Sequence, residues 1–203
     1  MMNIFEYLKL GIKHRGDPFF YKWLKGKHVL DVGSGQGLFL IKDPKNFVGI
    51  ELNPILVEKS LANGLNVHAM SALEIRFNTE TFDAIHAAQL IEHFNPGDAY
   101  RFLIESQNVL KKGGIIFLTT PGVKTVWNTF SHIRPYPPSA FAKLLIRETE
   151  GYLNNDKLSL ALVGYWGQRN YFRSKILTFL SGALDILIPP KNPIGWIIIL
   201  KKI

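Results

Sequence analysis

The chain has 203 residues and a mass of 23.0 kDa, a size that suits one domain with a small appendage. Hydrophobic residues make up 47% of it and charged residues 20%, a balance that excludes a disordered chain, a collagen-like chain and a coiled coil. It contains no cysteine, which excludes disulfides, zinc sites built on thiolates and a cysteine nucleophile.

The net charge of +8 is concentrated at the two ends of the chain. Residues 1–27 carry +4 and residues 151–203 carry +5, whereas residues 28–150 carry −1. A basic surface favours nucleic acid, an anionic membrane or an acidic substrate, although such charge often serves only solubility. The first residues lack the apolar core of a signal peptide, and no run of about 18 apolar residues occurs. We therefore expect a cytoplasmic protein without a membrane-spanning helix.

Short β-rich runs alternate with helical stretches in the middle of the chain. Strands are expected at residues 28–33, 47–52, 65–70, 81–89 and 113–120. A helix is expected at 54–62, with Asn53 as its N-cap and Pro54 at the first helical position. Another is expected at 98–110, closed by Gly113. Strands that alternate with helices predict a parallel sheet with right-handed crossovers.

The C-terminal part adds one helix, at 139–147, and two further strands, at 156–164 and 194–202. Between these strands lie a basic, aromatic stretch (165–175) and an apolar stretch (176–190). The whole set predicts an α/β fold, a doubly wound Rossmann-like sheet of seven mostly parallel strands with helices on both faces.

A glycine-rich turn follows the first strand and reads Asp31-Val32-Gly33-Ser34-Gly35-Gln36-Gly37. Glycines there allow unusual backbone angles and let a ligand approach the main chain closely. The turn opens a helix, expected to be short because Asp43-Pro44 ends it, and the free N–H groups at a helix start favour a negative group. Glu51 ends the next strand, where a carboxylate can accept both hydroxyls of a ribose. The spacing therefore predicts a nucleoside-binding site.

Two classes of cofactor compete for this loop. Dinucleotide-binding folds favour a third glycine three positions after the second, whereas Gly37 comes two positions after Gly35. Asp31 is unfavourable beside a pyrophosphate because like charges repel, but it suits a cofactor that carries an ammonium group. A nucleotide-dependent oxidoreductase is therefore the less favoured interpretation.

The pattern Asp-x-Gly-x-Gly-x-Gly on a first strand resembles motif I of class I S-adenosylmethionine-dependent methyltransferases of types 11 and 12. The resemblance covers roughly residues 28–152. Beyond the loop, the segments that carry it are Glu51-Leu52, Phe82-Asp83, Gln89-Leu90-Ile91-Glu92-His93, Val109-Leu110-Lys111-Lys112-Gly113-Gly114, Thr119-Thr120-Pro121 and His132-Ile133-Arg134-Pro135-Tyr136. The last segment is similar to one in the subgroup that includes quinone-biosynthesis O-methyltransferases.

The resemblance implies that S-adenosylmethionine is the cofactor and that its methyl group passes by SN2 transfer to an O, N or C atom of a small acceptor. The cofactor-binding residues that it implies, from the methionine end through the ribose and adenine to the sulfonium side, are Asp31, Gly33, Ser34, Gly35, Gly37, Glu51, Leu52, Ser71, Ala72, Leu73, Ala88 and Gln89. Ser71 stands where the family often has an aspartate beside the adenine, so that contact is expected to be weaker.

Two histidines are candidates for the acceptor side of the site. His93 follows the fourth strand and His132 follows the fifth, and an imidazole that titrates near neutrality can contact a substrate or accept its proton. The alternative for each is a histidine that is hydrogen-bonded inside the fold. No pair of histidines has ligand spacing on one helix face, so no metal site is predicted. Glu92 is interpreted as a solvated charge at a helix start.

One domain with a cover segment is expected. The helical N-terminal cover segment comprises residues 1–27, and the cofactor-binding domain comprises 28–203, with a basic and apolar insertion at 165–193. By the resemblance, these segments and residues 121–138 lie over the carboxyl edge of the sheet. Cations beside apolar residues favour a small acceptor, anionic or lipid-like, and peripheral contact with an anionic membrane. Nucleic acid is an unlikely partner because the basic residues are sparse. The oligomeric state stays open, and a non-catalytic cofactor-binding or membrane-surface module is the alternative function.

Overall fold

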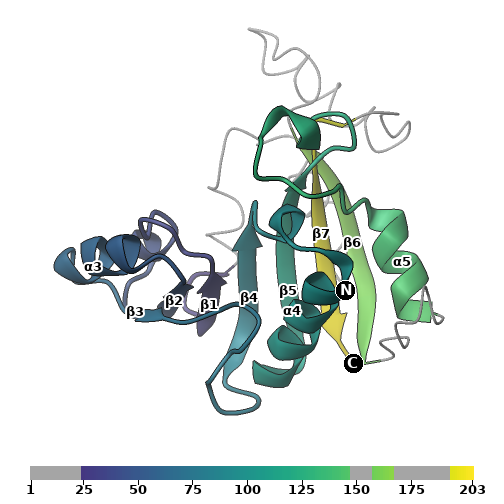
Figure 1. The fold of residues 1–203 in the computed structure, drawn as a ribbon. Helices are drawn as coiled ribbons and strands as arrows, with labels where there is room; N and C mark the ends of the chain where they lie inside the picture. The colour runs from purple at the N-terminus through teal and green to yellow at the C-terminus, as the bar shows by residue number, and fades with distance from the viewer. Residues whose placement is uncertain (1–23, 147–156, 167–192) are drawn as a thin grey trace, which may run out of the picture.

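The computed structural model of the chain describes residues 24–146, 157–166 and 193–203 (Figure 1). Its centre is a seven-stranded sheet in the order β3-β2-β1-β4-β5-β7-β6. The strands are β1 (Val29–Val32), β2 (Phe47–Glu51), β3 (Val67–Ala69), β4 (Phe82–Ala88), β5 (Leu110–Pro121), β6 (Leu158–Trp166) and β7 (Gly195–Lys202). Strands β1 to β5 pair in parallel, and β7 runs antiparallel to both β5 and β6. The predicted sheet of seven mostly parallel strands is confirmed.

Short helices connect the strands. In the described part of the chain they are α3 (Pro54–Ala62), α4 (Pro96–Val109), α5 (Pro138–Ile146) and the 3-10 turns η1 (Leu40–Lys42), η2 (Ile91–His93) and η3 (Val126–Asn128). Helix α3 begins as expected, because the side chain of Asn53 accepts the N–H of Ile55 at 3.0 Å and Pro54 lies in the first turn. Among the described helices, none combines the length and the apolar character that crossing a bilayer requires.

Alternate residues of the strands supply two hydrophobic clusters, one on each face of the sheet. Leu30 and Val32 of β1 join the cluster that α4 and α5 cover, together with Phe102. Val29 belongs to the second cluster, with Phe39 at the start of η1. In Figure 1, α4 lies in front of β5, and α5 lies beside β6. Every residue of β1 is buried, as expected for a parallel strand covered on both faces.

The predicted limits of the helix before β5 are wrong. Helix α4 begins two residues earlier, at Pro96, after the side chain of Asn95, which accepts the N–H of Asp98 at 2.9 Å. It ends at Val109, and β5 follows directly. Gly113 has φ +76° inside β5, in the stretch where the register between β4 and β5 shifts. The glycine therefore serves an irregularity in the strand and does not cap the helix.

The helix expected to be short after the glycine loop is a single 3-10 turn, η1. Asp43 ends it, because its carboxylate accepts the N–H of Gly26 at 2.8 Å and the side-chain amide of Asn46 at 2.9 Å. One turn provides little of the dipole of a full helix. Any anion near this loop would therefore depend on the loop's own N–H groups. The predicted cover (1–27) and insertion (165–193) lie almost entirely outside the described residues.

Candidate functional site

The glycine loop joins the carboxyl end of β1 to η1. Gly33, Gly35 and Gly37 have φ values of +72°, +56° and +75°, which only glycine adopts without strain. The N–H groups of Gly33 and Ser34 both donate to the carbonyl of Ile50, at 2.9 and 3.0 Å. The loop is therefore fastened to the end of β2 by its own backbone.

The three loop glycines differ in what surrounds them. A Cβ atom on Gly37 would collide with Leu65, and one on Gly33 would lie 3.1 Å from the side chain of Leu90. At Gly35 nothing lies within 4 Å of the position that a Cβ would take. Gly37 and Gly33 therefore permit close packing inside the protein, whereas Gly35 borders open space where a ligand can approach the backbone.

Glu51 connects this loop to the start of α3. One of its carboxylate oxygens accepts the N–H of Gly35 and the other accepts the N–H of Asn53, both at 2.9 Å. A carboxylate oxygen has two lone pairs, so both oxygens can still accept a hydrogen bond from a ligand hydroxyl. The neighbouring Leu52 is 72% exposed, so this edge of the described structure is open.

The turn after β3 lies beside Glu51, because the N–H of Met70 donates to the Glu51 carbonyl at 3.1 Å. It contains Ser71, Ala72 and Leu73, all partly exposed. The hydroxyl of Ser71 accepts the N–H of Leu73 at 3.1 Å, which leaves the hydroxyl hydrogen free to donate. The structure thus brings the residues predicted for the ribose and for the adenine to one edge of the sheet.

Ala88 and Gln89 lie at the carboxyl end of β4, and both are exposed. Gln89 has φ +54°, a conformation that costs a non-glycine residue about 1–3 kcal/mol. It is held there by Thr119 of β5, whose carbonyl accepts the Gln89 N–H at 2.8 Å and whose hydroxyl accepts its side-chain amide at 3.3 Å. A strained residue kept in place at the end of a central strand is a typical feature of functional sites.

Asp31 is buried below the glycine loop and pairs with a histidine that the sequence did not single out. Its carboxylate oxygen lies 2.6 Å from Nδ1 of His86 on β4. The His86 ring is stacked against Phe39, with centroids 3.9 Å apart, and against Phe117, with centroids 5.5 Å apart. Asp31 and His86 face each other in the parallel register of β1 and β4, and only that register could have indicated the pair.

The two predicted acceptor-side histidines lie together. The rings of His93, on η2, and His132, in the loop after η3, meet edge to face with centroids 4.8 Å apart. His132 Nε2 lies 4.0 Å from a carboxylate oxygen of Glu92. The loop is held against η2 because the N–H of Ile133 donates to the Glu92 carbonyl at 2.8 Å.

The prediction of a solvated Glu92 is wrong, because the residue is fully buried. Burial raises the pKa of its carboxyl group, and smaller opposite effects come from its own backbone, the Thr120 hydroxyl and the charge of His132. Although Thr120 lies close enough to have this effect, neither Glu92 oxygen makes a well-formed hydrogen bond within the described residues. The segment 91–93 is a 3-10 turn against the sheet and not the exposed first turn of a helix.

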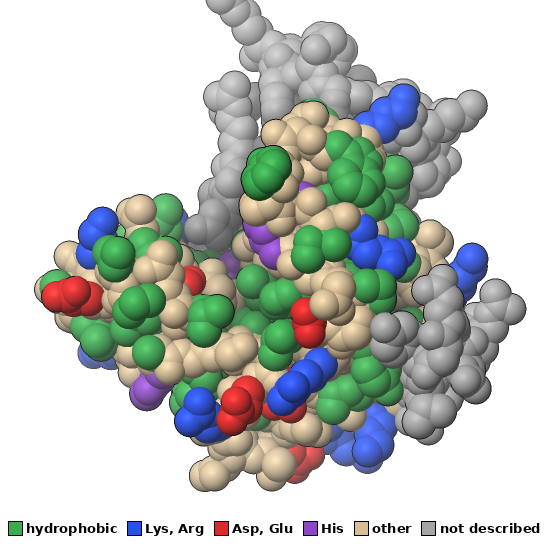
Figure 2. All heavy atoms as spheres, in the orientation of Figure 1, with side chains coloured by type: hydrophobic (Ala, Val, Ile, Leu, Met, Phe, Trp, Pro, Cys, Tyr) green, Lys and Arg blue, Asp and Glu red, His purple; other side chains and the backbone are tan. Residues whose placement is uncertain are grey.

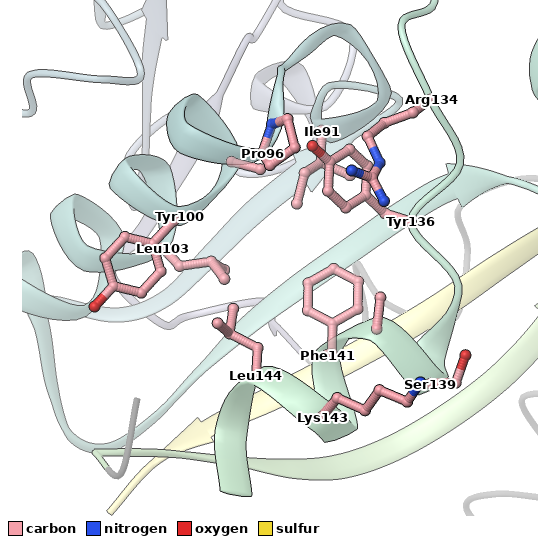
Figure 3. A pocket seen from close by; sticks show the side chains of 12 residues that line it. Ile91, Pro96, Tyr100, Leu103, Arg134, Tyr136, Ser139, Phe141, Lys143 and Leu144 are labelled. Carbon is pink, nitrogen blue, oxygen red and sulfur yellow. The ribbon is translucent and has the colours of Figure 1, made fainter. Parts of the chain in front are cut away.

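A cavity of about 270 Å³ lies between α4 and α5. Figure 3 shows Arg134 and Tyr136 at one end of it and Phe141 and Leu144 at the other. The guanidinium carbon of Arg134 lies 5.4 Å from the centre of the Tyr136 ring. None of the residues predicted for the cofactor or for the acceptor lines this cavity. The residues predicted for the cofactor and for the acceptor lie instead at the carboxyl ends of the parallel strands, where α/β folds bind their ligands.

Comparison with known proteins gives one family and a set of relatives. Residues 30–118 match the family model described as a methyltransferase domain. Over 111 residues the chain is 33% identical to 2-methyl-6-phytyl-1,4-hydroquinone methyltransferase 1, chloroplastic, of Oryza sativa subsp. japonica, covering 50% of this chain and 33% of that protein. Over 106 residues it is 29% identical to ubiquinone biosynthesis O-methyltransferase of Coxiella burnetii, covering 48% of this chain and 44% of that protein. The chain thus spans less than half the length of these two relatives.

Solved structures show the same fold over nearly the whole chain. A structure described as a SAM dependent methyltransferase from Archaeoglobus fulgidus superposes with a TM-score of 0.60 at 19% identity, covering 97% of this chain and 99% of that one. Residues 30–118 therefore match the methyltransferase domain model, and the described part of the chain has the fold of a solved structure that is described as a SAM dependent methyltransferase.

Proposed function

We propose that this protein binds S-adenosylmethionine and transfers its methyl group to a small acceptor molecule. The observation that carries the proposal is the arrangement of Gly35 and Glu51. An open space above a left-handed glycine adjoins a carboxylate that has lone pairs to spare, inside the region that matches the methyltransferase domain. When bound, the cofactor supplies an electrophilic methyl group on a sulfonium ion.

The residues of the carboxyl edge would hold and orient the cofactor. In this proposal Glu51 accepts the ribose hydroxyls beside Leu52, and the turn of Ser71, Ala72 and Leu73 borders the adenine. The methionine end would lie along the glycine loop, with Asp31, Gly33, Ser34, Gly35 and Gly37. Ala88 and the strained Gln89 would border the sulfonium side. Alignment of the reacting atoms and exclusion of water would then provide most of the rate enhancement.

His93 and His132 would contact the acceptor. Each ring has Nδ1 within hydrogen-bond distance of a backbone carbonyl, Ser131 at 3.2 Å and Val126 at 2.8 Å respectively. Because a carbonyl oxygen can only accept, Nδ1 carries the hydrogen and Nε2 is free to accept a proton from an acceptor hydroxyl. The printed names of the two curated relatives, a hydroquinone methyltransferase and an O-methyltransferase of ubiquinone biosynthesis, support a small acceptor with an oxygen nucleophile and an apolar part.

Peripheral contact with an anionic membrane is part of the same proposal. The loop between β5 and α5 exposes large hydrophobic side chains: 44% of Val123, 61% of Trp127, all of Phe130 and 50% of Ile133. Figure 2 shows hydrophobic side chains gathered on the upper part of the molecule, to which this loop belongs. Apolar and aromatic side chains beside a basic residue, here Lys124, are typical of an interfacial surface. Such a protein would work in the cytoplasm and at the membrane face that borders it.

Two measurements test the proposal. Calorimetric titration with S-adenosylmethionine and, separately, with NAD distinguishes the favoured cofactor from that of an oxidoreductase. Incubation of the full chain with cofactor labelled on the methyl group, against a panel of phenols, amines and lipid-like hydroquinones, then tests transfer. Binding without transfer to any of these acceptors would favour the non-catalytic module, and binding of neither cofactor would refute the proposal.

A further inference from the structure

We propose that Glu92, His93 and His132 form a binding site for one divalent transition-metal cation. The three residues come from two segments, η2 and the loop after η3, yet one ring nitrogen of each histidine and a Glu92 oxygen all lie within 4.8 Å of one another. Binding of the cation does not depend on the proposed methyltransferase function. Only the role of the cation toward the acceptor rests on that function. The sequence does not indicate the site, because the ligands meet only after β4 and β5 have paired.

The backbone contacts of both histidines assign them the tautomer that leaves Nε2 open to a metal ion. His132 Nδ1–H donates to the Val126 carbonyl at 2.8 Å, and His93 Nδ1–H donates to the Ser131 carbonyl at 3.2 Å. The lone pair of each ring is therefore on Nε2. A histidine that binds a metal through one nitrogen and donates the other N–H to a carbonyl oxygen is the usual arrangement in protein metal sites, because the outer contact fixes the ring.

The buried carboxylate of Glu92 also indicates a cation at this place. It is fully buried, and although the Thr120 hydroxyl lies close, neither of its oxygens makes a well-formed hydrogen bond in the part of the chain that the structure describes. A buried carboxylate without a partner is unfavourable, because it loses its hydration without compensation. A cation between Glu92 and His132, whose Nε2 lies 4.0 Å away, would supply that compensation.

The backbone holds the ligands in place before any cation arrives. The His93 contact with Ser131 and the N–H of Ile133, which donates to the Glu92 carbonyl at 2.8 Å, tie η2 to the loop at two points. The His132 contact with Val126 fixes the loop to η3. Ligand atoms around a bound transition metal lie about 3 Å apart, given metal–ligand bonds of about 2.1 Å. The observed spacing of up to 4.8 Å requires small rotations of the side chains to draw the ligands together.

The chemistry of the donors indicates the class of cation. Two imidazole nitrogens and one carboxylate suit Zn²⁺, Co²⁺ or Mn²⁺, whereas Mg²⁺ and Ca²⁺ favour sites made of oxygens. Three protein ligands leave a coordination position for water or for an oxygen of the acceptor. A hydroxyl bound there would lose its proton to solvent more readily, because the cation lowers the hydroxyl pKa. The two histidines would then act as ligands and not as proton acceptors.

The test is direct binding of the metal by the full chain, freed of bound metal with a chelator. Co²⁺ is titrated first, because its visible absorption reports nitrogen and oxygen ligands, and Zn²⁺ is then titrated by calorimetry. We expect one cation per chain, and a loss of affinity of about 100-fold or more in His93→Gln and His132→Gln. The matched control, His68→Gln, changes an exposed histidine of β3 and should bind like the parent chain. A 100-fold excess of Mg²⁺ should not displace the Co²⁺.

Several outcomes would overturn the site. They are the absence of a visible Co²⁺ band, unchanged affinity in His93→Gln, or an equal loss in His68→Gln. His93 is only partly buried, so its variant is expected to fold, which circular dichroism verifies. Titration of the same metal-free protein with S-adenosylmethionine separates the two proposals. Cofactor binding without metal binding refutes the metal site alone, and metal binding without cofactor binding refutes only the proposed function.

Discussion

Asp31 and His86 form a buried hydrogen bond of 2.6 Å across β1 and β4, directly below the glycine loop. Both residues are more than nine-tenths buried. The stacking of His86 against Phe39 links the pair to the one-turn segment that follows the loop. The acid of the motif therefore has one oxygen occupied by the protein itself, and its position is fixed by β4. We infer that the pair holds the end of β1 in the geometry that the loop requires.

Replacement of His86 by alanine should destabilise the protein by about 3–5 kcal/mol, because the Asp31 carboxylate would remain buried without its partner. Urea denaturation followed by circular dichroism measures the change. The control is His68→Ala, at an exposed position on β3, which should change stability by less than about 0.5 kcal/mol. Equal effects of the two substitutions on the free energy of unfolding would show that the Asp31–His86 contact does not stabilise the protein.

Glu51→Ala should weaken binding of S-adenosylmethionine by about 1–3 kcal/mol, the contribution of hydrogen bonds to a charged group. The substitution also removes the acceptor for the N–H groups of Gly35 and Asn53, so the loop becomes less ordered. Calorimetry on the variant gives the affinity. Glu58→Ala, on the exposed side of α3, is the matched control. Unchanged affinity in Glu51→Ala would remove this residue from the proposed site.

Gly35→Val should abolish cofactor binding while the protein still folds. The space next to Gly35 is open, so the new side chain meets no part of the described protein, but it would occupy the space proposed for the ligand. The positive φ of +56° adds strain of about 1–3 kcal/mol for a β-branched residue.

Gly64→Val separates these two effects. Gly64 has φ +72° and likewise has nothing within 4 Å of its Cβ position, so a side chain there would contact no residue of the glycine loop. The control should show a similar loss of stability, measured by urea denaturation, with normal affinity for the cofactor. Native affinity in a folded Gly35→Val variant would mean that the ligand does not approach this glycine.

The sequence predicted the sheet well because buried parallel strands are apolar and are separated by glycine, proline and asparagine signals. The sequence-based prediction was wrong where one residue pattern is compatible with two local structures. Gly113 looked like a helix cap, yet its positive φ serves an irregularity in β5. Glu92 looked like a solvated charge, because burial depends on the loop after β5, which packs against it from 40 residues away in the chain. The partnership of Asp31 and His86 similarly depends on the register of two strands that are distant in sequence.

Asp83 belongs to one of the sequence motifs, and its contacts predict that the stability of the protein depends on pH. One oxygen of its carboxylate accepts Nζ of Lys111 at 2.7 Å and the other accepts the N–H of His28 at 2.8 Å. The hydrogen bond from Lys111 has the largest effect and lowers the pKa of Asp83. Burial opposes it, and the backbone N–H of His28 adds a further, smaller lowering. A carboxyl group whose pKa is lower in the folded state stabilises the protein above the unfolded pKa, about 3.9. That contribution disappears as the pH falls through the folded value.

Asp83→Asn keeps an acceptor for the His28 N–H and removes only the charge. Because more than a third of the side chain is exposed, we expect a loss of at most about 1 kcal/mol at pH 7, reduced by salt. The difference in unfolding free energy between the parent chain and the variant should persist down to about pH 5 and disappear as the pH falls through the lowered pKa of Asp83 in the folded state. Lys111→Met should show the same loss at pH 7, and the double variant should show little more than either single change. A difference between Asp83→Asn and the parent chain that is constant from pH 7 to pH 2 would show that the ion pair with Lys111 is not its origin.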